Sequence, residues 1–172
     1  MSRSEPVAIQ LAVAEAYGVA ERLLEEEGRL PLFAVFHRGE RDAPVVAVLR
    51  LPVNDEAAAL EALREDASSI ASGHQASAVT LGGGGLLARG AEEAEARAIW
   101  QGLRTGTLES LADVPGARPA LLLEHHRPLS VTRAAFPLWS NGLGAQQLFL
   151  QTEPAAEAEP FAGIRFFAVP GA

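Results

Sequence analysis

The chain contains neither cysteine nor lysine. Without cysteine, it cannot form disulfides, thiolate nucleophiles, iron–sulfur clusters or cysteine-based zinc sites. All fourteen basic residues are arginine, which excludes Schiff-base chemistry, attachment of pyridoxal phosphate and a P-loop with its lysine. Proteins of reducing compartments rarely carry disulfides, so the composition fits a cytoplasmic protein.

Positive charge and long apolar runs are also scarce. The net charge of −8 argues against binding to nucleic acid or to anionic membranes, since both require a positive field. Glu5, Glu15 and Glu21 interrupt the first apolar stretch, so no signal-peptide core is predicted. The longest uncharged run of apolar residues and glycine, 78–88, is far shorter than the roughly 20 residues that span a bilayer. We therefore expect a soluble protein with no nucleic-acid and no membrane partner.

The rest of the composition is that of a globular domain. Hydrophobic residues make up 48% of the 172 residues and charged residues 21%, both in the usual range. No internal repeat is visible, and no linker is long enough to divide the chain. Because this length supports one hydrophobic core, we predict a single globular domain over residues 1–172.

A strand, a helix and a second strand are predicted between residues 45 and 81. Asn54 is a good N-cap for a helix over 55–72, and Gly73 is suited to end it in a left-handed conformation. The helix has one apolar face, made of Leu60, Leu63, Ala67, Ile70 and Ala71. Apolar strands at 45–51 and 78–81 flank it. This order predicts one βαβ crossover, with the two strands parallel in one sheet.

The remaining patterns complete an α+β fold. A helix over 6–27, ended by Gly28, precedes a strand at 32–37 that forms a hairpin with 45–51. Further helix is predicted at 91–103 and within 105–115, and further strands at 120–126, 131–136, 146–152 and 163–169, with a hairpin turn at Asn141-Gly142. We predict a mixed, largely antiparallel sheet of about seven strands with three or four helices.

The first hairpin is apolar on both faces. Alternation along the strand at 32–37 places Leu32, Ala34 and Phe36 on one face, and Phe33 and Val35 on the other. A sheet with one face in water alternates apolar and polar residues instead. We therefore expect both faces of this sheet to be covered, by helices or by a second subunit.

The run Gly82, Gly83, Gly84 and Gly85 provides the candidate cofactor-binding residues. The spacing from Gly83 through Gly85 to Ala88 satisfies the dinucleotide-binding fingerprint, in which backbone N–H groups face a pyrophosphate. However, no acidic residue ends a following strand about 20 residues further on, as that fold requires. We favour a strand end where backbones approach closely, and predict no cofactor.

The segment Glu124-His125-His126-Arg127 is the densest polar cluster. On a strand, Glu124 and His126 share one face and His125 takes the other. Glu124 and His126 are therefore the candidate catalytic pair, a general base oriented by a carboxylate. The simpler interpretation, which we favour, is a strand end that runs out into solvent before Pro128.

The same segment provides the candidate metal ligands. Glu124, His125 and His126 are suitable ligand types, and His37 or His74 could complete a site from a neighbouring element. Arginines also gather nearby, at Arg118, Arg127 and Arg133. Their guanidinium groups suit a small anion, but pairing with the acids of a neighbouring helix is the more ordinary role.

Three functional hypotheses follow. The first, which we favour, is a non-catalytic domain that acts by association, as a homodimer or with a protein partner, because a sheet leaves edges that must be covered. The second is an enzyme or ligand-binding protein that uses Glu124, His125 and His126, with or without a metal. The third is nucleotide binding at Gly82–Gly85.

Overall fold

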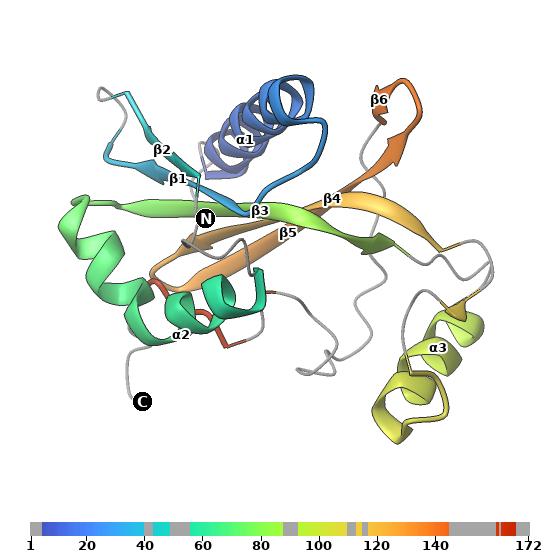
Figure 1. Ribbon diagram of the computed structural model, residues 1–172. Helices are drawn as coiled ribbons and strands as arrows, with labels where there is room; N and C mark the ends of the chain where they lie inside the picture. The colour runs from blue at the N-terminus through green and yellow to red at the C-terminus, as the bar shows by residue number, and fades with distance from the viewer. Residues whose placement is uncertain are drawn as a thin grey trace.

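A curled, six-stranded antiparallel sheet forms the centre of the protein, with strand order β2-β1-β3-β4-β5-β6 (Figure 1). The computed structural model describes residues 5–39, 43–48, 56–87, 93–109, 113–114, 117–144, 161 and 163–167. Its elements are α1 Glu5–Glu27, β1 Phe33–His37, β2 Val45–Val48, α2 Glu56–Gly73, β3 Ala78–Leu87, α3 Glu93–Thr105, β4 Arg118–Arg127, β5 Ser130–Trp139 and β6 Gly142–Leu143. None of the helices in these ranges has the length and apolar character needed to cross a membrane.

Helix α1 covers one face of the sheet. Its small apolar residues Ala16, Val19 and Ala20 pack with Phe33 and Val35 of β1, and the same cluster includes Leu121 and Leu123 of β4 and Ala134 and Phe136 of β5. The hydroxyl of Tyr17 donates a hydrogen bond of 2.9 Å to the carbonyl oxygen of Leu143, which ties the helix to β6. Gly28, with φ of +70°, ends the helix as predicted.

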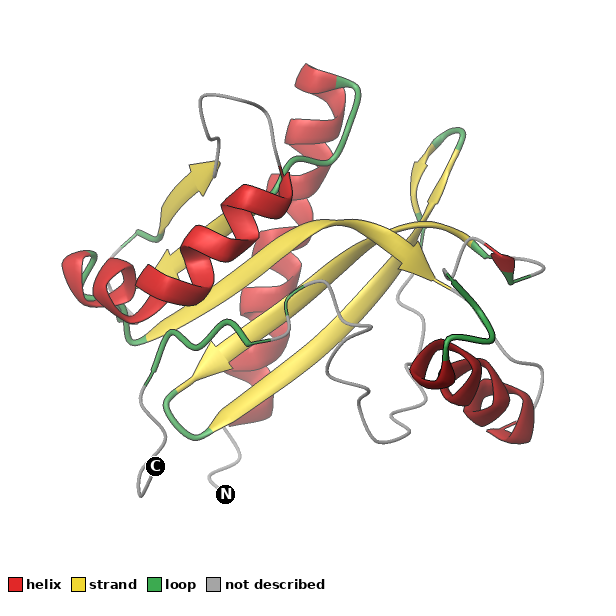
Figure 2. Ribbon diagram, turned by 60° about the horizontal axis from the view of Figure 1, so that its bottom comes forward, coloured by secondary structure: helices red, strands yellow, loops and turns green. Residues whose placement is uncertain are grey.

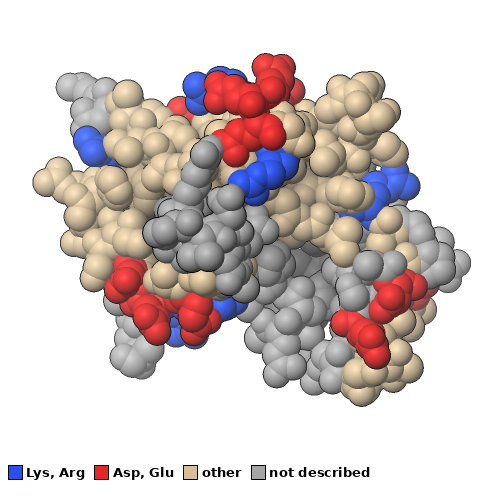
Figure 3. Space-filling view, in the orientation of Figure 1, with Lys and Arg blue, Asp and Glu red and all other residues tan. Residues whose placement is uncertain are grey.

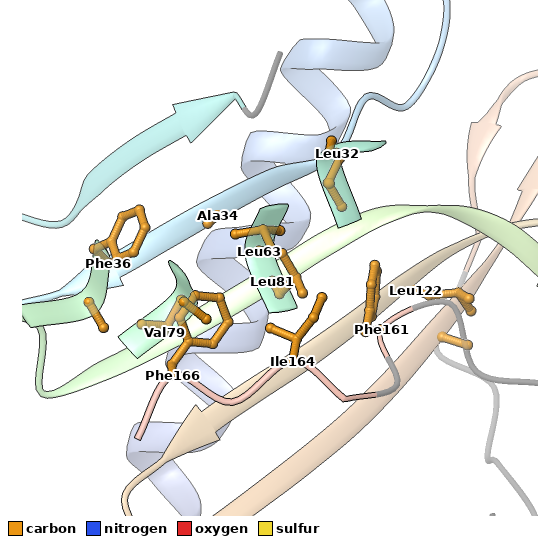
Figure 4. Packing of buried hydrophobic residues seen from close by; sticks show 14 of the residues in the cluster. Leu32, Ala34, Phe36, Leu63, Val79, Leu81, Leu122, Phe161, Ile164 and Phe166 are labelled. Atoms are coloured by element: carbon orange, nitrogen blue, oxygen red, sulfur yellow. The ribbon is translucent and has the colours of Figure 1, made fainter. Parts of the chain in front are cut away.

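Helix α2, with Phe161 and residues 163–167, covers the opposite face, so that α2 and α1 lie on opposite sides of the sheet (Figure 2). Leu63, Ala67 and Ala71 of α2 are buried against it, which confirms the predicted helix face. Beyond α2, a segment formed by Phe161 and residues 163–167, here called the C-terminal strap, lays Phe161, Ile164 and Phe166 on the sheet (Figure 4). The prediction that both faces are covered is therefore confirmed, and the cover consists of α1 on one face and of α2 with the C-terminal strap on the other.

The predicted βαβ crossover is not matched. Strand β1 lies between β2 and β3 and is antiparallel to both, so the strands that flank α2 run in the same direction within one sheet but do not pair. All the pairings in the described residues are antiparallel rather than mixed. β1 and β2 pair as a local hairpin, and β3 pairs with the other edge of β1. Strand β2 covers 45–48 rather than 45–51, and α2 covers 56–73 rather than 55–72; residues 49–55, with Asn54, lie outside the described ranges.

The predicted numbers of elements also differ from the structure. The strand predicted at 163–169 is wrong for residues 163–167, which the structure describes. Buried Ile164 and Phe166 alternate with exposed Arg165 as predicted, but the segment lies on the face of the sheet and does not pair with another strand. The strand predicted at 146–152 lies outside the described residues. Of the three helices described, only α1 and α2 cover the sheet, and α3 stands apart from it (Figure 1).

Two turn predictions have different outcomes. The hairpin turn near Asn141-Gly142 is confirmed, with Leu138 opposite Leu143 and Trp139 opposite Gly142. The left-handed stop predicted at Gly73 is wrong, because the residue with positive φ after α2 is Gln75, at 53°. A positive φ is uncommon in residues other than glycine, and nothing in the sequence marked Gln75 as the residue that would adopt it.

Candidate functional site

Buried polar side chains gather at one end of the sheet, where β3 begins and β4 ends. The buried polar and charged residues in the described ranges are Thr80, Glu124, His125 and His126. Alternation along β4 points Glu124 and His126 to the α2 face and His125 to the α1 face, as predicted. The interpretation that this strand end runs out into solvent is wrong, because these three residues are only 4–6% exposed.

On the α1 face, four side chains from four elements form what we call the histidine–threonine network: Glu15, His37, Thr80 and His125. The hydroxyl of Thr80 hydrogen-bonds His37 Nε2 at 2.9 Å and His125 Nδ1 at 2.8 Å. The other ring nitrogen of His37, Nδ1, lies 3.7 Å from Glu15 Oε2. The two imidazole rings are 5.5 Å apart, edge to face. The network therefore links α1, β1, β3 and β4.

The donors and acceptors of the network limit its protonation state. The hydroxyl of Thr80 carries one hydrogen, so it donates to one ring nitrogen and accepts from the other. With both histidines neutral, His37 carries its proton on Nδ1, toward Glu15, and accepts from Thr80 at Nε2, while Thr80 accepts from the Nδ1–H of His125. These hydrogen bonds are compatible with two neutral rings or with one protonated ring, but not with two protonated rings, which would both donate to Thr80.

The surroundings keep both histidines neutral. Burial lowers the pKa of His37, and the Glu15 carboxylate opposes that shift only in part. Burial, together with the charges of His37, Arg127 and His126, lowers the pKa of His125 to about 4. At a pH between the ordinary pKa of about 6.5 and this value, His125 binds a proton in the unfolded chain but not in the folded chain. The contribution of the neutral His125 to the free energy of unfolding is therefore fully present above that range and is lost as the pH falls through it.

The order carboxylate, imidazole, hydroxyl in Glu15, His37 and Thr80 is that of a hydrolase triad. Two observations argue against this role. Thr80 is fully buried on the face that α1 covers, and His125 occupies the second hydrogen-bonding position of its oxygen. No substrate carbonyl can approach Thr80 Oγ1 in this conformation.

On the α2 face, Glu124 forms a second cluster with His126 and Arg133, here called the Glu124 cluster. Arg133 stands directly opposite Glu124 on β5 and donates from Nε to Oε2 at 2.6 Å. His126 Nε2 lies 3.4 Å from Glu124 Oε1, but the geometry is not that of a hydrogen bond, and the nitrogen is buried without a hydrogen-bond partner. Burial by itself would raise the pKa of Glu124, but the contacts with His126 and Arg133 outweigh it and the pKa is lowered.

The predicted metal ligands do not converge. His125 points to the face opposite Glu124 and His126, and His37 meets His125 through Thr80 rather than through a shared ion site. His74 stacks on Phe36, with ring centroids 4.3 Å apart. Within the described ranges, no three histidine, aspartate or glutamate side chains are placed to hold a metal ion.

The glycine run lies in the middle of β3 rather than in a turn that leads into a helix. A Cβ on Gly82 would overlap the ring of Phe33, with Phe33 Cε1 at 2.6 Å and Leu123 Cδ2 at 2.8 Å. At Gly85 a Cβ would overlap the end of Leu122. These glycines let large side chains of β1 and β4 cross over β3, and the strand-to-helix turn of the dinucleotide fingerprint is not formed at Gly82–Gly85.

The two polar clusters explain how such a strand keeps its register. Glycines present no side chains that distinguish one register from another. The cross-strand pairs Thr80 with His125 and Glu124 with Arg133 do so, because a slip of one residue would send each partner to the opposite face. We interpret both clusters as devices that fix the pairing of β3, β4 and β5.

Sequence reasoning identified Glu124, His125 and His126 but not Glu15 or Thr80, and it assigned His37 only to a metal site. The available signal was Thr80, a single hydroxyl in an otherwise apolar strand. Its partners depend on the strand order, which places β3 between β1 and β4. Of the arginines, Arg133 pairs with an acid as expected, although on a strand rather than a helix, and Arg118 stacks on Trp139 at 4.3 Å.

Comparisons of the chain with protein-family models, with curated proteins and with solved structures find no match. The function must therefore be argued from the geometry of this chain.

Proposed function

We propose that the protein is a binding domain that associates with a second copy of itself through the open edge of β2, and that it does not act by catalysis. The observation that carries this proposal is the position of β2. It is the last strand in the sheet order, and no strand in the described residues pairs with its outer edge.

The sequence of β2 leaves this edge unprotected. Proteins blunt edge strands with charged residues, proline or bulges, and the four residues of β2, Val-Val-Ala-Val, include none of these. Val46 is 39% exposed. At the other side of the sheet, β6 has only two residues and β5 carries Arg133 and Pro137. The β2 edge is thus the better template for another strand.

A second copy fits this edge by symmetry. Two β2 strands that pair antiparallel about a two-fold axis would join two six-stranded sheets into one, with the same surface on both subunits. Figure 3 shows that acidic side chains gather over the helices, while most of the described atoms in view on the side where Figure 1 places β1 and β2 are uncharged. The net charge of −8 on each copy opposes association only at long range, so added salt should strengthen the dimer.

The burial of both polar clusters supports a role without catalysis. Thr80, Glu124, His125 and His126 are all at most 6% exposed, whereas catalytic groups must reach a substrate. The polar groups of the two clusters interact with one another across adjacent strands. Their burial is therefore explained by the pairing of these strands, and no catalytic role is needed to explain it.

Light scattering of the full chain at micromolar concentration tests the proposal. We expect the wild type to have twice the 18.1 kDa mass of one chain and Val46→Lys to be monomeric, because it places two ammonium groups near the two-fold axis. Val131→Lys is the matched control, since Val131 is an equally apolar residue, 46% exposed, at the far side of the sheet. A monomeric wild type, or a monomeric control variant, would contradict association at β2.

One observation favours a second candidate, binding of a small ligand at the Glu124 cluster. The buried Nε2 of His126 lacks a hydrogen-bond partner, and such orphaned groups are rare in folded proteins. A ligand could reach it only after the C-terminal strap moves, since the ring of Phe166 lies 5.1 Å from that of His126. A small-molecule screen by thermal shift tests this candidate: hits that vanish in His126→Phe but persist in His74→Gln would support it, and hits common to both would remove it.

A further inference from the structure

We propose that the histidine–threonine network is an acid-sensitive latch for α1, so that α1 leaves the sheet at mildly acidic pH while β3, β4 and β5 stay paired. This inference does not depend on the dimer. It rests on where Glu15, His37, Thr80 and His125 lie and on what each of them can donate or accept.

The network sits under α1 and nowhere else. Thr80 and His125 lie on the sheet face that α1 covers, and Thr80 is fully buried there. His37, at the rim, keeps 17% of its side chain exposed, and Glu15 on α1 keeps 43%. Movement of α1 away from the sheet would therefore hydrate both imidazoles at once, whereas the Glu124 cluster on the opposite face would remain covered.

Protonation of both histidines breaks the hydrogen-bonding pattern of the network. A histidine protonated on both nitrogens only donates, so two such rings would both donate to Thr80 Oγ1 and leave its own hydrogen without the ring nitrogen that now accepts it. Two positive rings would also stand 5.5 Å apart in a mostly buried site. The closed form of α1 and the form with both histidines protonated are thus mutually exclusive.

The charged groups around the network act in opposite directions. Glu15 attracts a proton to His37, but burial outweighs it. Arg127, two residues beyond His125 on the same strand, and His126 on the other face both disfavour a charge on His125. On β3 the facing group is the uncharged Thr80. His37 and His125 therefore bind protons more weakly when α1 is closed than when it is open, so acid favours opening.

The apolar contacts of α1 are modest enough for such a latch to matter. The buried residues of α1 in this cluster are Ala16, Val19, Ala20 and Leu23, and the alanines among them bury less apolar area than leucine or phenylalanine would. On the opposite face, α2 is joined by the C-terminal strap, which adds three larger buried side chains, Phe161, Ile164 and Phe166. Because the latch lies under α1 alone, its loss should free α1 while the cover of the opposite face stays in place.

Hydrogen exchange of the full chain between pH 7 and pH 5 tests the latch, with each rate divided by the intrinsic rate at that pH. We expect the protection of amides in Ala16–Leu23 to fall by up to about tenfold per pH unit for each histidine that is protonated on opening, while amides of Leu121–Leu123 stay protected. In the double variant His37→Gln, His125→Asn, amide groups replace Nε2 and Nδ1 without titrating, so the extra pH dependence should disappear. His74→Gln, on the other face, is the control and should behave as the wild type.

Parallel loss of protection in α1 and β4 at every pH would overturn the latch, because it would mean global unfolding. Wild-type pH dependence in the double variant would overturn it as well. If the double variant does not fold, imidazole NMR of the wild type decides. Titration of both His37 and His125 together with the loss of α1 protection supports the latch, and titration of both rings while α1 stays protected refutes it.

Discussion

The replacement of Gly82 by alanine tests most sharply whether the glycine run serves packing. Gly82 stands opposite Phe33 on β1 and opposite Leu123 on β4. The added Cβ would overlap the Phe33 ring and lie 2.8 Å from Leu123 Cδ2. Phe33 is fully buried and Leu123 is 1% exposed, so neither side chain has free space into which it can move.

The expected magnitude follows from two opposing effects. Overpacking of a filled core typically costs about 1–3 kcal/mol, and a collision with a rigid, buried ring belongs at the upper end. Replacement of glycine by alanine also reduces the entropy of the unfolded chain, which stabilises by about 0.4–1 kcal/mol. We expect Gly82→Ala to lower the free energy of unfolding by about 2 kcal/mol.

Gly84→Ala is the matched control, two residues along the same strand and on the same face. Its Cβ would meet the Leu30 carbonyl oxygen at 3.5 Å and Leu30 Cβ at 3.6 Å, which are ordinary contacts. With no collision, the entropic effect alone remains, and we expect a change between zero and a gain of about 1 kcal/mol. Neither glycine has a positive φ, so backbone strain does not separate the two variants.

Urea unfolding followed by tryptophan fluorescence measures both variants. With a slope of about 2 kcal/mol per molar for a chain of this size, the Gly82→Ala midpoint should fall by about 1 M, and the Gly84→Ala midpoint should not fall. Equal losses in the two variants would refute the packing argument, because they would show that the strand needs glycine for a reason other than the space between Phe33 and Leu123.

Three further predictions concern the buried charges and the glycines. The free energy of unfolding should fall as the pH drops from about 6.5 to 4, by at most about 3 kcal/mol from His125. In urea unfolding at several pH values, His125→Asn should reduce this dependence of the free energy on pH. An unchanged pH dependence would show that other groups cause it. Glu124→Gln should destabilise by about 1–3 kcal/mol, since it strips a partner from the 2.6 Å contact with Arg133. Glu61→Gln, in an exposed 2.8 Å pair with Arg64, should change stability by less than about 1 kcal/mol, and similar losses in both would contradict the role given to burial. Millimolar NAD, ATP or FAD should not raise the melting temperature, whereas a shift that Gly84→Ala abolishes would revive nucleotide binding.

The parts of the fold that depend on local periodicity could be predicted from the sequence. Alternation in β1 assigned Phe33 and Val35 to one face and Phe36 to the other, and the structure places them there. Helical spacing placed Leu63 and Ala67 on the buried face of α2. Each of these assignments needs only the period of one element, so no knowledge of its neighbours was required.

The parts that depend on neighbours could not be predicted. Strand β3 was expected to stop at Gly82, because glycine is unfavourable in strands, but Phe33 and Leu123 supply the side chains that the glycines lack. The meeting of His37, Thr80 and His125 follows from the strand order, in which β3 lies between β1 and β4. The alternation of Ile164 and Phe166 predicted a strand, because a segment that lies on a sheet face buries every second residue just as a paired strand does.

Cross-linking at β2 tests the proposed association most directly, because the chain has no cysteine of its own. Single cysteines placed in turn at Val45, Val46, Ala47 and Val48 give four proteins with one thiol each, and Val131→Cys provides a control of similar exposure to Val46. With a short bismaleimide at micromolar protein, we predict covalent dimers from the β2 positions nearest the two-fold axis and none from the control. Covalent dimers from none of the four β2 positions, or from Val131→Cys to the same extent, would contradict pairing at this edge.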